Sequence, residues 1–295
     1  MNSYVTALPS LGILEVSGED ACSFLHGQLT RDILSLEEGQ SAWSAWCHAN
    51  GRVITTLLVT MTAGHYYLLL PADLIDAVCR RLNMYMLRAK VSIDNISDRY
   101  SCLGACIDTA ETEADPINWD FSIVHARLPQ DQLRTIWITA KGEIPALISG
   151  LASHGLRIVN DQRWLLNDIA DGIPWIQMAT TEQALPQELG LERLQGLNYD
   201  KGCYPGQEVV ARLHYRGRQK RQLCTAVIDA ISTTPAIGSV VRNLAGSAAG
   251  FVLTAASEGN TCHLLLLVDT ELTPDRRLQL ETGVTTTCTL IDPQD

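Results

Sequence analysis

The sequence predicts an α+β protein that ends in a small β-barrel. Residues 1–160 alternate between strand-like and helix-like hydrophobic patterns, which is typical of helices packed on sheets. Residues 161–206 hold one short helical pattern and then a long irregular run, and the C-terminal residues hold only short strand-like patterns divided by turns. We therefore expect an α+β region over residues 1–221 and a β-barrel over residues 222–295.

The α+β region is expected to form two subdomains, the first over roughly residues 1–90 together with late segments. Alternating hydrophobic residues predict its strands over 11–16, 41–48 and 53–61, with turns at Asn50-Gly51 and Ala63-Gly64. Asn-Gly is the strongest short-range signal for a two-residue hairpin turn. Two helices are expected: one buries Ala21, Phe24 and Leu25, and Pro71 starts the other, over residues 72–88.

The second subdomain is expected over residues 91–160. Its predicted elements are strands near 90–96, 101–107, 122–127 and 134–139, an acidic loop over 108–120, and a helix from about Pro145 to His154. A short helix over 161–171 is then stopped by Gly172, and Ile173-Pro174 begins an irregular run that reaches Gly206. The barrel strands are expected near 222–230, 238–243, 249–256 and 262–268, with two more before Asp295.

The composition excludes several classes of protein. At 295 residues, with 46% hydrophobic and 19% charged residues, the chain fits a globular protein and neither a disordered chain nor a fibre. Its net charge of −11 excludes general electrostatic capture of nucleic acid, so any anion site must be local. No apolar run approaches the ~20 residues of a membrane helix, and residues 1–10 lack the pattern of a secretory signal. We therefore expect a cytoplasmic protein with no membrane partner.

The nine cysteines are dispersed and include no Cys-x-x-Cys pair, which suits a reducing compartment better than a disulfide scaffold. Most of them are expected to be buried and to behave as small hydrophobic residues. The adjacent pairs Cys47-His48 and Cys262-His263 lack a second pair at metal-ligand spacing. No stably bound metal is therefore expected.

The run from Lys201 to Glu208, with the sequence KGCYPGQE, is the most informative segment of the chain. Gly202 and Gly206 bracket a tight loop, and the proline between them suits the first turn of a following helix. Cys203 then lies just ahead of a helix N-terminus, where the helix dipole and the Lys201 ammonium favour its thiolate. Cys203 and Lys201 are the candidate catalytic residues. The alternative is a buried cysteine in a loop whose glycines serve only backbone shape.

This run, followed by Arg212, resembles the signature of the YgfZ-type folate-binding proteins, which are relatives of the glycine-cleavage T-protein, an aminomethyltransferase. The resemblance extends to Leu11–Asp32, which includes the run Gly27–Thr30, and to Asp161–Ile176 and Pro186-Gln187. It implies a cloverleaf of ferredoxin-like α+β subdomains around a central folate cavity, with a C-terminal β-barrel. The strand and helix patterns agree with this fold.

The resemblance also implies that tetrahydrofolate or a one-carbon derivative is the cofactor. Trp164 matches the family's folate-contacting tryptophan and is able to stack on a pteridine ring, although an aromatic residue on a helix is also a common core residue. A second family tryptophan corresponds to Leu11, and the family's acidic residue corresponds to Ala170, beside Asp171. Asp171 is either a pterin partner or a solvated helix end. The candidate cofactor-binding residues are Trp164, Asp171, Tyr204, Gln207, Glu208, Arg212 and Arg216.

For function, the resemblance implies a folate-binding accessory protein that supports iron-sulfur enzymes, including those that thiolate transfer RNA. Aminomethyltransferases carry an essential aspartate where this chain has Arg52 to Thr56, so the general base of that reaction has no obvious substitute. A factor without catalytic activity is therefore favoured. A folate-dependent aminomethyl or methyl transferase remains the alternative.

A second alternative is a tRNA-binding module formed by residues 212–221. Residues 201–221 hold six cations and one acid, a charge of +5, while the rest of the chain carries −16. Such a local patch attracts a folate glutamate tail or an RNA phosphate, and Tyr215 within it is able to stack on a base. The opposing interpretation is a solvated connector before the barrel, because charge runs are usually solvated.

Overall fold

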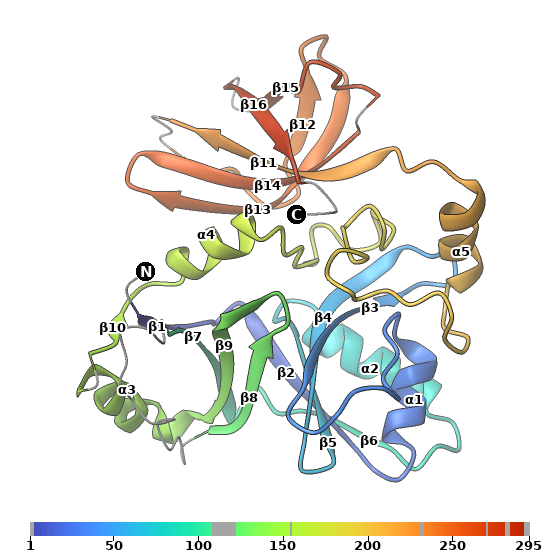
Figure 1. Ribbon diagram of the computed structural model, residues 1–295, viewed down its shortest axis with the longest axis vertical. Coiled ribbons are helices and arrows are strands. Elements are labelled where there is room, and N and C mark those ends of the chain that lie inside the picture. Colours follow the sequence, from blue (N-terminus) through green and yellow to red (C-terminus); the bar gives the residue numbers. More distant parts are fainter. Residues whose placement is uncertain are drawn as a thin grey trace. The chain divides into compact units, whose positions relative to one another are not determined.

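The computed structural model describes residues 3–107, 122–153, 155–229, 233–269, 271–280 and 284–291 (Figure 1). The chain divides into two compact units. The first consists of Met1–Ser44 and Leu57–Asp161, and the second of Ala45–Thr56 and Gln162–Asp295. Within the described residues, no helix is long and apolar enough to cross a membrane. The division at residues 221 and 222 that the sequence suggests remains a prediction.

One sheet of the first unit has the strand order β10-β1-β7-β9-β8. These strands are β1 (Tyr4–Ala7), β7 (Tyr100–Cys106), β8 (Ser122–Leu128), β9 (Asp131–Ala140) and β10 (Arg157–Ile158). Helix α3 (Ile144–Ser153) packs on this sheet, because its Leu147 and Leu151 share one buried cluster with Trp137 of β9. Strands β1 and β10 were not predicted, since four and two residues are too few to show an alternating pattern.

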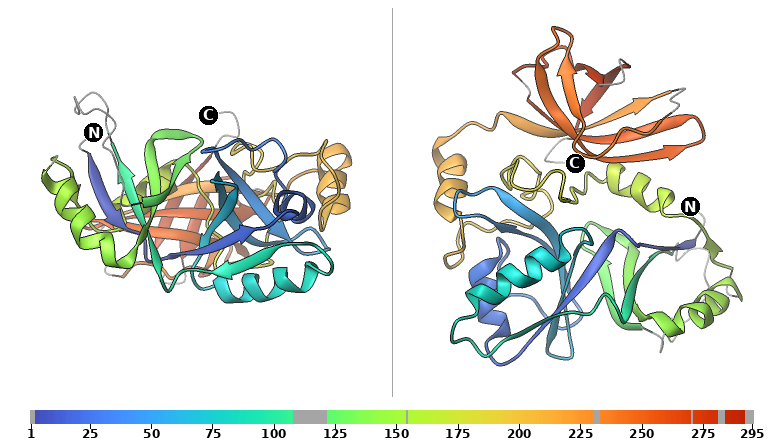
Figure 2. Two further views of the ribbon diagram at one scale, coloured as in Figure 1. Left: turned by 90° about the horizontal axis from the view of Figure 1, so that it is seen from below. Right: turned by 180° about the vertical axis from the view of Figure 1, so that it is seen from behind.

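The other sheet has the order β3-β4-β5-β2-β6. Its strands are β2 (Leu11–Ser17), β3 (Ser41–Cys47), β4 (Val53–Thr62), β5 (His65–Pro71) and β6 (Ser92–Asn95). Helix α1 (Ala21–Gln28) contacts β5, and α2 (Ile75–Tyr85) crosses one face of the sheet (Figure 2). Ala21, Phe24 and Leu25 are buried as predicted.

Two predicted boundaries in this sheet are wrong. Pro71 ends β5 rather than starting a helix, because β5 continues its pairing with β2 as far as Leu11 and Pro71, and α2 begins only at Ile75. The connection between β3 and β4 is five residues long, from His48 to Arg52, rather than a two-residue turn. His48 N donates to Arg52 O at 2.8 Å, and Gly51 N donates to His48 O at 2.8 Å with Gly51 at φ +79°.

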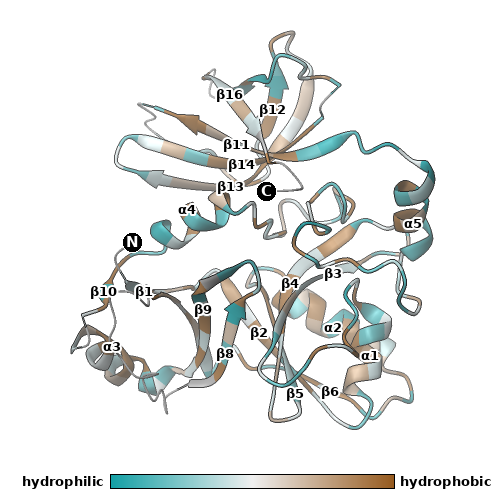
Figure 3. Cartoon of the chain, viewed as in Figure 1, coloured by the Kyte–Doolittle hydropathy of each residue, from teal (hydrophilic) through white to brown (hydrophobic). Residues whose placement is uncertain are grey.

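The second unit begins with helix α4 (Gln162–Ala170), which Gly172 terminates with φ +61°, as predicted. The irregular run that follows leads to helix α5 (Gln207–Arg216). Its turns are fixed from outside the run, since Val53 N donates to Ala184 O and Glu182 N donates to Val53 O, both at 2.8 Å. In Figure 3 the segment from α5 to the following strand is coloured largely as hydrophilic.

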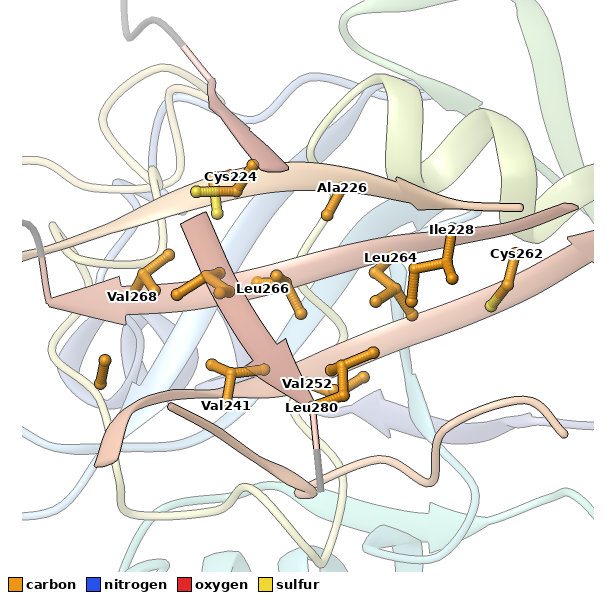
Figure 4. Close-up of a cluster of buried hydrophobic side chains, with 13 residues drawn as sticks. Cys224, Ala226, Ile228, Val241, Val252, Cys262, Leu264, Leu266, Val268 and Leu280 are labelled. Atoms are coloured by element: carbon orange, nitrogen blue, oxygen red, sulfur yellow. The ribbon is translucent and has the colours of Figure 1, made fainter. Parts of the chain in front are cut away.

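The C-terminal residues form the predicted barrel, a closed sheet with the order β11-β14-β13-β12-β15-β16. Its strands are β11 (Arg221–Ile228), β12 (Val240–Asn243), β13 (Ala248–Glu258), β14 (Thr261–Asp269), β15 (Arg277–Leu280) and β16 (Thr285–Leu290). Small and branched side chains fill its interior, among them Cys224, Leu264 and Leu266 (Figure 4). Three of the nine cysteines lie in this core, as expected of buried small hydrophobic residues.

Candidate functional site

The signature loop, which we define as Lys201–Gly206, leads directly into helix α5. Gly206 caps the helix with φ +83°, and its carbonyl oxygen accepts the amides of Val209 and Val210 at 3.1 and 3.2 Å. Pro205 lies in the turn before the helix rather than in its first turn, because the helix begins at Gln207. At the other end of the loop, Gln207 Nε2 donates to the Lys201 carbonyl at 3.4 Å. The loop is thus tied to the helix at both ends.

The loop rests on the connection between β3 and β4 through two glycines. A Cβ on Gly206 would lie 2.6 Å from Gly51 Cα and 2.6 Å from His48 O. A Cβ on Gly51 would lie 3.0 Å from Val209 Cβ. Both glycines also have positive φ, so glycine is required at each for conformation and for space. This contact brings together segments that are far apart in the sequence, and it fixes the position of the loop within the second unit.

Cys203 is the exposed member of the nine cysteines, all of which lie in the described residues and are free thiols. Cys22 and Cys79 are half-buried, and the other six are buried. Burial raises the pKa of the Cys102 thiol to about 12, and burial also raises the pKa of Cys47. Cys203 is therefore not buried, in contrast to that part of the alternative interpretation. Its reactivity stays a prediction.

Tyr204 and Lys201 turn toward each other beside this cysteine. Lys201 Nζ lies 5.1 Å from the centroid of the Tyr204 ring, a cation–π distance. Tyr204 is 5% exposed, and burial raises the pKa of its phenol, which therefore stays neutral and able to donate a hydrogen bond. Its hydroxyl has no hydrogen-bond partner among the described residues. A buried hydroxyl in this state is suited to a bound polar molecule.

Gln187 offers a second buried polar atom near the loop. Its Nε2 donates to Val210 O of α5 at 2.7 Å, while its Oε1 lacks a partner within the described chain. A hydrogen bond from the Gln187 side chain acts to lower the pKa of the Tyr199 phenol, so Gln187 lies beside Tyr199. From the sequence, Gln187 was identified only as part of a family match, because nothing in the local pattern distinguishes it.

Helix α4 and the segment that follows it contribute three buried side chains, a carboxylate and two indoles, which we call the α4 cluster: Trp164, Asp168 and Trp175. Trp164 is 2% and Asp168 1% exposed, and they lie one helical turn apart on the same face. Trp175 Nε1 donates to Asp168 Oδ2 at 3.0 Å. The helix itself packs on β13, where Ser257 N donates to Gln162 Oε1 at 3.0 Å.

Asp168 was not among the predicted site residues, because the family's acidic position corresponds to Ala170 and the candidate acid was Asp171 beside it. Ala170 is exposed and Asp171 half-buried, whereas Asp168 is the buried carboxylate. The backbone carbonyls of Asp171 and Gly172 both accept Nη2 of Arg193, which secures the end of the helix. The four-residue spacing from Trp164 was the available signal, because it places Asp168 on the same helical face.

The remaining predicted site residues lie on α5. Glu208, Arg212 and Arg216 are exposed and follow one another at intervals of four residues, so they form one stripe of the helix. Gln207, at the start of the helix, is half-buried. All candidate site residues thus belong to the second unit.

The hydroxyl side chains at the start of β4 are structural. Thr56 Oγ1 donates to Pro174 O and accepts Ile176 N at 3.0 Å, and Thr55 Oγ1 donates to Thr56 O at 3.0 Å. Both threonines are fully buried. These residues hold the irregular run in place and supply no carboxylate.

No three His, Cys, Asp or Glu side chains gather around a common point within the part of the chain that the structure describes. The groups of the second unit that are suited to ligand binding are the exposed thiol of Cys203, the buried Tyr204 hydroxyl and Gln187 Oε1 that lack partners among the described residues, and the α4 cluster.

Residues 5–106 match the model of the GCVT N-terminal domain family. The "tRNA-modifying protein YgfZ" of Vibrio vulnificus (strain CMCP6) is 33% identical over 230 residues, which cover 74% of this chain and 68% of that protein. The protein of the same name from Hamiltonella defensa is 30% identical over 232 residues, with 74% and 68% covered.

Among solved structures, the glycine cleavage system aminomethyltransferase T from Bartonella henselae superimposes with a TM-score of 0.73 over 99% of this chain and 85% of that one, at 15% identity. This similarity confirms the aminomethyltransferase-like α+β fold that the sequence predicts. The extent and identity of the sequence matches go further, and they show that the chain belongs to the YgfZ family.

Proposed function

We propose that this protein binds tetrahydrofolate or a one-carbon derivative and supports iron-sulfur enzymes that modify tRNA, with Cys203 at its working site. The relatives at 30–33% identity are named tRNA-modifying proteins, and the fold is that of an aminomethyltransferase. The observation that carries the proposal is the exposure of Cys203, alone among nine cysteines, on a loop fixed by two glycines. A thiol that served only packing would be buried.

The residues of the second unit fit a folate. A pterin ring has a flat face for stacking and an edge of N–H donors and ring acceptors, and the α4 cluster supplies indoles and a buried carboxylate that match it. Asp171 at the end of α4 is the further carboxylate candidate. Tyr204 Oη is able to donate to a folate, and Gln187 Oε1 is able to accept from one. When bound, the cofactor supplies a carrier for a one-carbon unit.

The cationic residues of α5 suit the other end of the same molecule. Arg212 and Arg216 are able to bind the glutamate carboxylates of a folate tail, since guanidinium groups pair with carboxylates through two hydrogen bonds. Lys201 contacts the Tyr204 ring within the signature loop, and Gln207 attaches the loop to the helix. Glu208 on the same stripe provides the one opposing charge.

Tetrahydrofolate binding is expected to weaken about tenfold or more when Trp164 is replaced by alanine, because an aromatic contact and its buried area are lost. Calorimetric titration of the wild-type protein and the variant measures this change. Trp164→Phe keeps a stacking ring and separates loss of stacking from loss of fold, and Leu165→Ala, on a half-buried position of the same helix, is the control. Absence of binding to the wild-type protein would rule out the cofactor.

Cys203→Ala is expected to abolish support of iron-sulfur enzymes in cells that lack the wild-type gene. The readout is the content of thiolated nucleosides in tRNA together with the activity of an iron-sulfur enzyme. Cys22→Ala removes a half-buried thiol in the first unit and serves as the control, with activity retained. Full activity of the Cys203→Ala protein at normal abundance would refute a working role for this thiol.

A further inference from the structure

Residues 201–221, which we call the basic segment, hold three arginines that have no acidic partner among the residues that the structure describes. Arg221 forms a bidentate ion pair with Glu188, in which Nε donates to Oε1 at 3.0 Å and Nη2 donates to Oε2 at 2.7 Å. Lys220 Nζ lies 3.8 Å from the Glu271 carboxylate. By contrast, the described residues offer no acidic partner within 4.0 Å to the three other arginines of the segment, which are all exposed: Arg212, Arg216 and Arg218. The charge that the sequence assigns to this segment is thus concentrated on three guanidinium groups.

An aromatic cluster accompanies these arginines. The rings of Tyr199 and His214 stack with centroids 3.9 Å apart and planes at 23°. Tyr215 lies edge-on to both rings, at 4.8 Å from His214 and 6.2 Å from Tyr199, and is 66% exposed. The sequence of residues 212–221 indicated one aromatic residue for base stacking, Tyr215, whereas the fold assembles three rings, because Tyr199 approaches α5 from the preceding irregular run.

Glu192 holds the cluster in a fixed geometry. Its Oε1 accepts the hydroxyl of Tyr199 and lies 3.2 Å from His214 Nδ1. Burial and the Glu192 carboxylate both raise the pKa of Tyr199, so the phenol keeps the proton that it donates. Tyr215 is therefore an exposed ring mounted on a rigid base, which lowers the entropy cost of stacking a further ring upon it.

The geometry points to an RNA-binding site formed by Arg212, Tyr215, Arg216 and Arg218, which we call the α5 surface. Tyr215 stacks on an unpaired base, and the arginines bind phosphates on either side of it. Single-stranded RNA is recognised by aromatic stacking combined with cationic backbone contacts. An acidic protein surface would also pair with the arginines, but it would not explain the exposed Tyr215 ring, which is positioned to stack on a nucleic-acid base. The inference extends the proposed function, since it gives the tRNA a place of contact.

The test is equilibrium binding of deproteinised tRNA, and of a short hairpin with an unpaired loop, over a series of salt concentrations. With all three arginines replaced by glutamine, the slope of log K against log salt is expected to fall by about 2, because each phosphate contact on single-stranded RNA contributes roughly 0.7. Tyr215→Ala is expected to weaken binding of the hairpin about tenfold and to leave the salt slope unchanged. The same variant should bind a fully paired duplex as the wild-type protein does.

Matched controls use residues of the same kind elsewhere. Arg80, Arg88 and Arg277 are likewise exposed, and their replacement by glutamine changes the net charge by the same amount. Tyr85→Ala removes another exposed tyrosine, one that is 45% exposed. Equal losses in the control and α5 variants would overturn the site. A wild-type protein that binds tetrahydrofolate but not RNA would overturn this inference alone, and one that binds RNA but not tetrahydrofolate would overturn the cofactor proposal alone.

Discussion

Gly206→Ala is expected to lower the free energy of unfolding of the second unit by about 3 kcal/mol. The alanine Cβ would lie 2.6 Å from backbone atoms of Gly51 and His48, which cannot yield as a flexible side chain can. Overpacking of this kind costs roughly 1–3 kcal/mol, and the φ of +83° adds about 1 kcal/mol for a residue with a Cβ. Urea denaturation followed by tryptophan fluorescence measures the loss.

Gly246→Ala separates the two causes. Gly246 has φ +84°, and a Cβ there would meet nothing within 4 Å, so this variant carries the conformational cost without the collision. It is expected to lose about 1 kcal/mol. If both variants lose the same amount, the close contact between the signature loop and the β3–β4 connection contributes nothing to stability, and the rigid presentation of Cys203 must be abandoned.

Glu188→Ala is expected to cost about 2–3 kcal/mol. Glu188 is buried, and its carboxylate accepts Leu185 N at 2.8 Å as well as two donors from Arg221. Its removal leaves a guanidinium that is 24% exposed without its partner at the start of the barrel. Breaking a buried pair costs roughly 3–5 kcal/mol, and partial solvation of Arg221 reduces this figure.

Glu271→Ala is the matched control for that pair. The Lys220–Glu271 contact spans 3.8 Å between side chains that are 65% and 49% exposed, so its loss is expected to cost less than about 0.5 kcal/mol. Thermal and urea unfolding of both variants decide the comparison. If Glu188→Ala is no more destabilised than Glu271→Ala, Glu188 does not anchor the irregular run to β11.

Short sequence patterns correctly predicted the elements whose ends are determined by neighbouring residues. Gly172 ended α4 as expected, because an αL glycine is a strong helix stop, and the turn-divided pattern after position 221 predicted six barrel strands. The signature loop and α5 also followed from glycine and proline placement. The prediction that Pro71 starts a helix was wrong because Pro71 pairs with Leu11 of β2. This pairing joins distant residues and cannot be recognised in a local pattern.

The features that escaped prediction depend on contacts between distant residues. Gly51 and Gly206 each suggest a turn, but the sequence does not show that Gly51 occupies the space that a side chain on Gly206 would need. Charge counting could not separate Arg221, bound by Glu188, from Arg216 and Arg218, which have no acidic partner among the described residues. Asp168 differs from these residues, because its helical spacing from Trp164 is visible in the sequence, whereas the family resemblance points to Ala170.

The division of the second unit between two separated stretches imposes an order on its folding during protein synthesis. Thr56 leaves the ribosome 118 residues before Pro174, the residue that accepts its hydroxyl. At about 5–20 residues per second, the nascent strand waits about 6–24 s for that partner. During this interval the buried Val53, Ile54, Thr55 and Thr56 lack their native partners within the second unit, so a chaperone that shields nascent chains would find its target at the start of β4.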